Sequence, residues 1–565
     1  MNPSPVIVDT SRLGGKRKSR KESKGRQVDA QAAIDVAALL GDAPRRRDLL
    51  IEHLHLIQDR YGHLSSRHLV ALAAEMKLAM AEVYEVATFY HHFFVVKDDE
   101  PIPAPLTVRV CETLSCQMAG ARELLKKLQA SAGSGVRVIA APCVGRCEQA
   151  PAVLVGRHPV AQATCEKVMQ AIDAGLTEHE PDAYIDLHAY RADGGYATLR
   201  ACIDGERTAD DVIAELESSA LRGLGGAGFP AGRKWRIVRS EAAPRLMAVN
   251  IDEGEPGTFK DRHYLERDPH RFLEGMLIAA WAVGIAEVYL YLRDEYAGCR
   301  EILQRELAAL AENPPCPLPP IQLRRGAGAY ICGEESAMIE SIEGKRGMPR
   351  LRPPYVAQVG LFDRPTLEHN METLYWVRDV LERGGAWFAG QGRHERKGLR
   401  SFSVSGRVAE PGVKLAPAGI TVRELIDEFC GGMLPGHDLY AYLPGGASGG
   451  ILPASMGDIP LDFDTLQPHG CFIGSAAVIV LSQHDRARDA ALNLMHFFAH
   501  ESCGQCTPCR VGTEKAVGLL AEPKWNLPLL DELSLAMADA SICGLGQAAP
   551  NPVQCVVRYF PHELG

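Results

Sequence analysis

Eight of the sixteen cysteines fall into two sets, and each set calls for four thiols from separate segments to meet at one point. The tighter set comprises Cys503, Cys506 and Cys509 in HESCGQCTPCRVG, followed by Cys543 in SICGLG. The spacing C-x2-C-x2-C with a distant fourth cysteine is typical of a [4Fe–4S] cluster, because three closely spaced thiolates can cap one face of a cubane. A structural zinc site is the alternative. Arg510 is either a cation that tunes the cluster or an ordinary exposed arginine.

The second set has a different spacing, C-x4-C and then C-x3-C after a long gap. Its members are Cys111, Cys116, Cys143 and Cys147, and Cys111 and Cys143 each follow a segment with strand character (LTVRVC and VRVIAAPC). Four thiolates from two strand-end loops suit a [2Fe–2S] cluster. Zinc sites with four cysteines usually pair C-x2-C knuckles, which neither half offers, so zinc and free thiols are the lesser alternatives.

Composition limits the class of protein. A chain of 565 residues with 46% hydrophobic and 23% charged residues can form several globular domains. The net charge of -10 argues against nucleic-acid binding. The longest apolar run, residues 276–286, is shorter than the roughly 20 residues that span a bilayer, and we recognise no signal peptide. We therefore expect a cytoplasmic protein with no membrane insertion.

Changes in pattern divide the chain into six segments. Residues 1–30 are basic and predict a disordered tail, which could alternatively dock a partner. The periodicity predicts helices over 31–100, a small α/β unit over 101–175, and alternating helices and strands over 176–400, with strands at RLMAVNID, AEVYLYL and IQLRRGA. A β-rich, glycine-studded module with one helix follows over 401–485, and helices return over 486–565.

A glycine-rich stretch, SALRGLGGAGFPAGRKW, contains the dinucleotide fingerprint G-x-G-x-x-G at Gly223, Gly225 and Gly228. A Rossmann site requires a strand directly before the first glycine, whereas DDVIAELESSALR reads as a helix. The remaining prediction is a loop whose backbone N–H groups approach an anion or a planar ring, with Lys234 available for a phosphate. Phe229 and Trp235 either stack on that ring or fill the core.

Two further turns are rich in carboxylates. VNIDEGEPGTFKDR carries Asp252, Glu253, Glu255 and Asp261, which could equally form a solvated acidic turn. RRGAGAYICGEESA places a pair of glutamates at a predicted helix start, where a carboxylate favours the helix dipole.

Taken together, these motifs resemble the electron-input module of respiratory complex I and its soluble NAD-linked diaphorase relatives. Residues up to about 160 resemble the 24-kDa-type subunit through AEVYEVATFYHHF, VCETLSC and APCVGRC. Residues from about 200 onward resemble the 51-kDa-type flavoprotein through LRGLGGAGFPAGRKW, VNIDEGEPGTFKDR, YICGEESA, RLRPPY, ESCGQCTPCRVGTEK and SICGLG. The resemblance implies an α/β multidomain fold: an N-terminal helical bundle with a thioredoxin-like [2Fe–2S] domain, an FMN-binding α/β domain, a β-grasp-like SLBB module, and a C-terminal helical bundle holding [4Fe–4S].

The resemblance also implies ligand contacts for individual residues. The loop would lie beneath FMN and NAD(H), with Lys234 on the flavin phosphate, Phe229 on the adenine end, and Glu255 and Glu335 positioning the nicotinamide for hydride transfer between NAD(H) and FMN. Three positions depart from the family pattern: His369 before Asn370, Arg352 and Tyr355 around Pro-Pro, and Ile237 in place of a stacking aromatic. The full set of implied contacts is Gly223, Gly225, Gly226, Ala227, Gly228, Phe229, Lys234, Asn250, Asp252, Glu253, Glu255, Tyr330, Gly333, Glu334, Glu335, Arg352, Tyr355, His369 and Asn370.

No segment offers a molybdopterin or nickel site, so we expect the second substrate to react on a partner subunit. PTLEHNMETLYWVRDVLERGG resembles the β subunits of NAD-dependent formate dehydrogenases, which implies a molybdenum- or tungsten-containing formate dehydrogenase α subunit as partner. The alternatives are the subunits of an NAD-reducing hydrogenase or a complex I-like enzyme. A relay subunit without nucleotide turnover and a zinc-stabilised thiol oxidoreductase are hypotheses of other classes.

Overall fold

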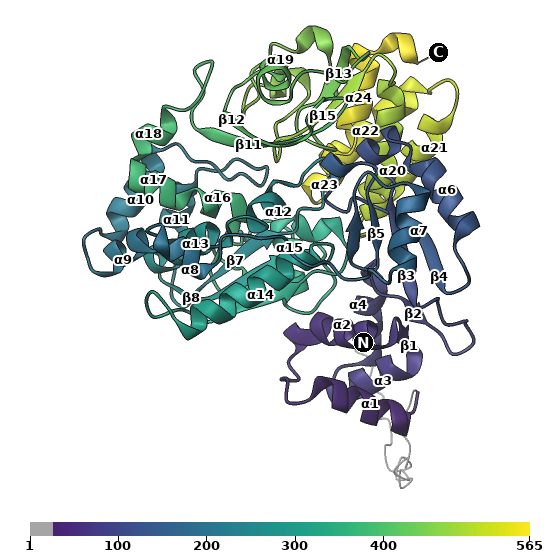
Figure 1. Cartoon of the computed structure of the whole chain (residues 1–565), viewed down its shortest axis with the longest axis vertical. Coiled ribbons are helices and arrows are strands. Elements are labelled where there is room, and N and C mark those ends of the chain that lie inside the picture. The colour runs from purple at the N-terminus through teal and green to yellow at the C-terminus, as the bar shows by residue number, and fades with distance from the viewer. Residues whose placement is uncertain (1–25, 565) are drawn as a thin grey trace, which may run out of the picture.

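The structure is a computed structural model that describes residues 26–564. The basic tail expected over residues 1–30 therefore lies, up to residue 25, outside the described part. Four helices open the described chain: α1 (Ala30–Leu40), α2 (Leu50–Tyr61), α3 (Ser66–Glu75) and α4 (Met80–Phe89). Asp29 and Ser65 cap α1 and α3 by accepting backbone N–H groups, which fixes where these helices begin. This helical block lies at one end of the molecule (Figure 1).

The first cysteine set lies on a small four-stranded sheet with the order β4-β3-β5-β6. Its strands are β3 (Leu106–Cys111), β4 (Val136–Ala141), β5 (Val153–Val155) and β6 (His158–Val160), with helices α5 (Leu114–Met118), α6 (Ala121–Ser131) and α7 (Cys165–Asp173). Because β3 and β4 are parallel, their carboxyl ends meet at one edge. The expectation that both strands end in cysteine loops is confirmed.

The central domain is built on a parallel sheet with the order β10-β7-β8-β9. The strands expected from the sequence are β7 (Arg245–Ile251), β8 (Ile285–Leu292) and β9 (Ile321–Arg325). The fourth strand, β10 (Thr366–Asn370), was not foreseen, because TLEHN is short and its polar residues give little strand signal. β10 pairs with β7 and aligns Asn370 with Asn250.

Helices surround this sheet and form the bulk of the middle of the molecule (Figure 1). The long apolar run belongs to α13 (Pro269–Val283), which is buried along almost its whole length and continues into β8. Within residues 26–564, no helix combines the length and apolarity that crossing a bilayer requires. The remaining helices of this domain are α8 (Leu187–Ala192), α9 (Ala197–Ile203), α10 (Ala209–Ser218), α11 (Ala231–Ser240), α12 (Lys260–Leu265), α14 (Ala297–Glu312), α15 (Glu335–Ile342), α16 (Met371–Tyr375), α17 (Val377–Arg383) and α18 (Gly385–Ala389).

The β-rich module follows as a five-stranded mixed sheet with the order β12-β11-β15-β13-β14. The strands are β11 (Leu399–Gly406), β12 (Gly412–Pro417), β13 (Leu439–Leu443), β14 (Leu452–Pro453) and β15 (Ala477–Ser482). The single helix expected here begins as α19 (Val422–Glu424), and Thr421 and Glu424 form a capping box at its N-terminus. The helix continues as a π-helical turn over Leu425–Phe429.

The C-terminal helices are α20 (Ala487–Glu501), α21 (Thr507–Ala521), α22 (Leu527–Ala540), α23 (Gly544–Ala548) and α24 (Asn551–Tyr559). They pack beside both the β-rich module and the small cysteine-bearing sheet (Figure 1). Asn493 of α20 donates hydrogen bonds to Glu112 and Gln117 of that sheet domain. The two cysteine sets are therefore carried by domains in direct contact.

Candidate functional site

The first cysteine set is assembled and buried. The Sγ atoms of Cys143 and Cys147 lie 3.4 Å apart, and Cys111 contacts both Cys116 and Cys143. Backbone N–H groups donate to three of the sulfurs: Gly145 to Cys143 at 3.4 Å, Ala152 to Cys116 at 3.4 Å, and Gly257 to Cys147 at 3.3 Å. N–H donors of this kind stabilise an anionic iron–sulfur centre.

The second set lies between α20 and α23. The loop after α20 carries Cys503 and Cys506, Cys509 lies in the first turn of α21, and Cys543 directly precedes α23. Burial raises the pKa of the Cys543 thiol to about 12, and the charge of the nearby Cys503 adds to that rise. Arg510 hydrogen-bonds the carbonyl of Gly504, so its guanidinium folds back on the cysteine loop.

Both sets fit the clusters that their spacing predicts. The thiols of each set are electrostatic neighbours of one another. Burial raises their pKa and so disfavours free thiolates, and a bound metal would supply the compensating positive charge. Within residues 26–564, the other eight cysteines belong to neither of these two sets.

A cleft of about 640 Å³ gathers the predicted nucleotide contacts. It is lined by the glycine loop between α10 and α11, the carboxyl ends of β7 and β10, and the segment before α15. Every predicted contact borders it except Tyr355, which is 56% exposed and lies elsewhere. Parallel strands β7 and β10 end together, so the cleft occupies the edge where ligands bind in open α/β sheets.

The glycine loop approaches its neighbours more closely than side chains would permit. A Cβ on Gly225 would lie 2.9 Å from the Cβ of Asn370, and one on Gly228 would lie 2.5 Å from the ring of Phe463. Gly228 also has a φ of +65°, which favours glycine. Helix α10 ends just before the loop and no strand precedes it, so the rejection of a Rossmann fingerprint is confirmed.

Carboxylates dominate the charge of the cleft. Burial raises the pKa of Asp252 and of Glu255, and Glu255 accepts hydrogen bonds from the backbone and hydroxyl of Ser448. The Oδ2 atom of Asp252 is buried and has no hydrogen-bond partner among the described residues, so it is free to accept a donor from a bound ligand. A planar ligand with N–H or O–H groups, such as a flavin, fits this acceptor.

Two cations face these acids. Lys234 Nζ contacts the carbonyl of Glu368 at 3.0 Å and its carboxylate at 3.3 Å. Arg352 is bound by Glu334 and, at 2.7 Å, by Glu335. Both cations already have carboxylate partners, but Lys234 has one and Arg352 has two, so Lys234 keeps more of its charge for a phosphate.

The structure resolves the roles left open for the aromatic residues. Trp235 is fully buried and donates from Nε1 to His369 Nε2 at 2.7 Å. Burial keeps the pKa of His369 well below its ordinary value, so this imidazole is a neutral acceptor. Phe229 is 39% exposed at the mouth of the cleft, where a ring can stack on it.

The β-rich module and the C-terminal helices complete the cleft, which sequence reasoning missed. Ser448, Phe472 and Ser475 come from loops of the module. Leu545, Gln547 and Asn551 come from α23 and the segment after it. The glycine run LPGGASGG, which contains Ser448, was a local signal of close backbone approach.

The environment of Glu253 predicts that the stability of the fold depends on pH. Burial, followed by the charge of Asp261, raises the pKa of Glu253 to about 7. The pKa of Glu253 is higher in the folded state than in the unfolded state. Its contribution to the free energy of unfolding, up to about 3 kcal/mol, is therefore fully present below pH 4.5 and is lost as pH rises through about 7. Glu253→Gln should therefore narrow the difference between thermal unfolding midpoints at pH 5.5 and pH 8. The exposed Glu532→Gln is the control, and an unchanged difference in Glu253→Gln would contradict the assignment.

Comparisons with known families match four segments of the chain. Residues 36–175 match the thioredoxin-like [2Fe-2S] ferredoxin family, 216–379 the Nuo51 FMN-binding domain, 401–452 the SLBB domain, and 489–565 the NADH-ubiquinone oxidoreductase-F iron-sulfur binding region. The expected fold class is confirmed, and so are FMN, [2Fe–2S] and [4Fe–4S] as cofactors, with NAD consistent.

Individual relatives agree. The mitochondrial NADH dehydrogenase [ubiquinone] flavoprotein 1 of Dictyostelium discoideum is 41% identical over 68% of this chain and 84% of its own length. The mitochondrial NADH-ubiquinone oxidoreductase 51 kDa subunit of Neurospora crassa is 40% identical over 67% of this chain and 80% of its own length. A chain of an air-oxidised NAD+-reducing [NiFe]-hydrogenase superposes with a TM-score of 0.80 and 32% identity over 93% of this chain and 94% of that one.

Proposed function

The chain belongs to the family of the NADH-ubiquinone oxidoreductase 51 kDa flavoprotein, and on that premise we propose that it is the diaphorase subunit of a soluble NAD-dependent formate dehydrogenase. The coarser activity, that of an NADH-oxidising flavin and iron–sulfur protein, follows from the family. When bound, FMN accepts or returns the electron pair of NAD(H) and exchanges single electrons with the iron–sulfur centres. The protein itself binds, orients and shields these groups.

One observation carries the diaphorase part of the proposal: the nucleotide cleft and the second cysteine set share a wall. Cys543 is followed at once by Gly544 and Leu545, which line the cleft. Glu501, two residues before Cys503, accepts the backbone N–H of Tyr330, another lining residue, at 2.9 Å. A nucleotide in the cleft would therefore lie next to the cluster that takes its electrons.

The roles proposed for single residues rest on this arrangement. Lys234 would bind phosphate, Asn250, Asp252 and Glu253 would contact the flavin, and the glycine loop would support both nucleotides. Ser448 holds the Glu255 carboxylate in one orientation, which suits a residue that positions the nicotinamide. Glu335 would act from the opposite side, where Arg352 fixes it.

Two partners are proposed, each supported by a different observation. The segment PTLEHNMETLYWVRDVLERGG favours a molybdenum- or tungsten-containing formate dehydrogenase α subunit. The solved hydrogenase chain, which matches both cysteine domains of this chain at once, favours hydrogenase subunits as the second candidate. Purification of the native complex followed by metal analysis separates them: molybdenum or tungsten supports the first, and nickel supports the second.

The diaphorase activity has its own test. The isolated chain, reconstituted with flavin, iron and sulfide, should reduce an artificial dye with NADH and should be brown. A brown chain that holds flavin but does not oxidise NADH would be a relay protein without nucleotide turnover. A colourless, zinc-containing chain would instead be a thiol oxidoreductase.

A further inference from the structure

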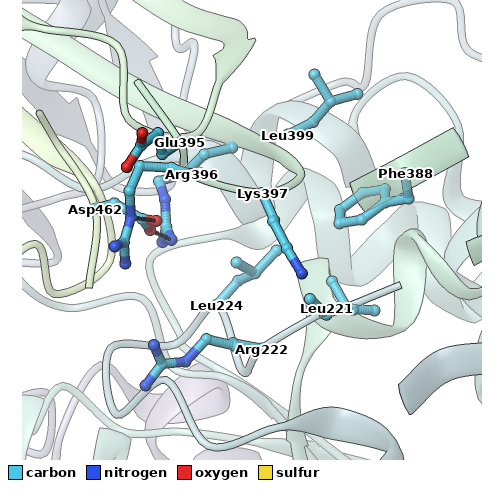
Figure 2. Close-up of a pocket in the computed structure, with 11 residues that line it drawn as sticks. Leu221, Arg222, Leu224, Phe388, Glu395, Arg396, Lys397, Leu399 and Asp462 are labelled. Atoms are coloured by element: carbon cyan, nitrogen blue, oxygen red, sulfur yellow. Dashed lines mark hydrogen bonds and ion pairs between the residues drawn. The ribbon is translucent and has the colours of Figure 1, made fainter. Parts of the chain in front are cut away.

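A second pocket, shown in Figure 2, shares the glycine loop with the nucleotide cleft. Its volume is about 240 Å³, and it is bounded by residues 220–224, α18 and the segment that leads into β11. Residues Leu221, Arg222 and Leu224 line this pocket, while Gly223 and Gly225 line the cleft. One short loop thus separates two cavities.

Four cations surround the pocket: Arg222, Arg396, Lys397 and Arg400. Asp462 is shared by two of them, at 2.8 Å from Arg396 Nε and 2.5 Å from Arg400 Nη2. Asp464 binds Arg222 at 2.9 Å. Glu395 also lines the pocket, so three carboxylates stand against four cations and the pocket keeps a net positive charge.

Two polar groups in this pocket lack partners. Arg400 is 4% exposed, and its Nε makes no hydrogen bond within the described chain. Lys397, at the mouth, makes no hydrogen bond or ion pair with any residue of the range 26–564, and its side chain extends toward Leu221 (Figure 2). Lys397 is exposed and keeps its full charge, and the Arg400 guanidinium lines the same pocket, so an anion bound there would pair with two positive charges.

The remaining wall is apolar. Leu221, Leu224, Phe388 and Leu399 form it, and Figure 2 shows Leu221 near the Lys397 amine. The volume is below the range of about 300–1,000 Å³ that accommodates drug-sized ligands, so the ligand must be small. An anionic head with a short apolar body matches this combination better than a bare inorganic ion does.

The pocket is connected to the nucleotide loop through one aromatic ring. The guanidinium groups of Arg222 and Arg400 lie over Phe463 at 4.4 Å and 4.3 Å from its centroid. The same ring packs so tightly against Gly228 that a Cβ there would lie 2.5 Å away. A ligand that draws Arg400 away from Phe463 would loosen the support of Gly228 in the cleft.

We propose that this pocket binds a small carboxylate with an apolar body, held by Lys397 and Arg400, and that its occupation weakens nucleotide binding through the glycine loop. The coupling rests on the proposed nucleotide cleft, whereas the binding itself does not. The site is separate from every residue assigned above to FMN, NAD(H) or the clusters.

Calorimetric titration of the cofactor-loaded chain with benzoate tests the binding. We expect saturable binding that weakens about tenfold or more in Lys397→Gln, as the loss of one charge-assisted hydrogen bond implies. Lys127→Gln, an equal charge change on exposed α6, is the control and should bind benzoate like the unaltered chain. Inorganic phosphate at matched ionic strength should bind more weakly than benzoate, since it cannot use the apolar wall.

Steady-state kinetics test the coupling. Saturating benzoate should raise the KM for NADH about fivefold in the unaltered chain and leave it unchanged in Lys397→Gln. Without benzoate, both chains should oxidise NADH equally, so a failure of the proposed function is seen separately. Absence of saturable binding, equal binding by Lys397→Gln, or phosphate binding as tight as benzoate overturns the site. Binding without any change in KM overturns the coupling.

Discussion

Cys543→Ala is expected to remove the [4Fe–4S] cluster and leave the [2Fe–2S] centre in place, so that iron falls from about six to about two atoms per chain. Cys543 is the only predicted ligand of its set outside residues 503–509, and the three remaining thiolates cannot complete a four-ligand site. Electron transfer to the partner should fall by more than about 100-fold, since even outer-shell changes around metal sites cost 10–100-fold. Iron analysis, electron paramagnetic resonance and NADH-driven turnover of the complex measure the two effects.

Flavin content distinguishes this result from general unfolding. The flavin contacts of the central domain lie on β7, β10 and the glycine loop, so we expect the variant to retain flavin. Cys316→Ala is the matched control, because Cys316 is also half-buried but belongs to neither set, and it should keep all of its iron. A Cys543→Ala protein with a full iron complement would refute the ligand assignment.

The parts of the fold with strong local signals were predictable from the sequence. The cysteine-ended strands β3 and β4 and the apolar strands β7 and β8 follow from side-chain periodicity, which is a local property. The helix before the glycine loop was equally local, and it excluded a Rossmann site. Strand β10 was not predicted because three of its residues, Glu368, His369 and Asn370, line the cleft, and their polar side chains weaken the apolar pattern typical of a buried strand.

The composition of the cleft was predictable only in part. Motif resemblance indicated residues of the central domain, and all but Tyr355 border the cleft. Ser448 and Asn551, from two other domains, have no distinguishing pattern of their own, because serines and asparagines are common in loops. Their positions depend on how three domains pack together, as seen where Asn551 Nδ2 donates to the carbonyl of Ser448 at 3.0 Å. Local sequence carries no record of such long-range contacts.

The sign of the charge in the cleft poses a problem that sequence inspection had not raised. Both nucleotides carry phosphates, yet the lining includes Asp252, Glu253, Glu255, Glu335 and Glu368. Burial, followed by the charge of Glu368, raises the pKa of Glu335, and Lys234 opposes that rise. Neutralised acids reduce the repulsion of a phosphate, but a positive charge is still needed to attract one.

Lys234→Ala should therefore lower both flavin content and NADH affinity. Arg352 is a weaker substitute for Lys234, since two carboxylates, Glu334 and Glu335, share its charge. Without Lys234, Glu368 loses its ion pair and faces the ligand phosphate, and a lost charge-assisted contact of about 1.5–3 kcal/mol corresponds to roughly a 10- to 150-fold loss of affinity. Flavin per chain and the KM for NADH measure the change. Lys234→Arg keeps the charge and should retain most flavin, whereas full flavin occupancy in Lys234→Ala would mean that the phosphate binds elsewhere in the cleft.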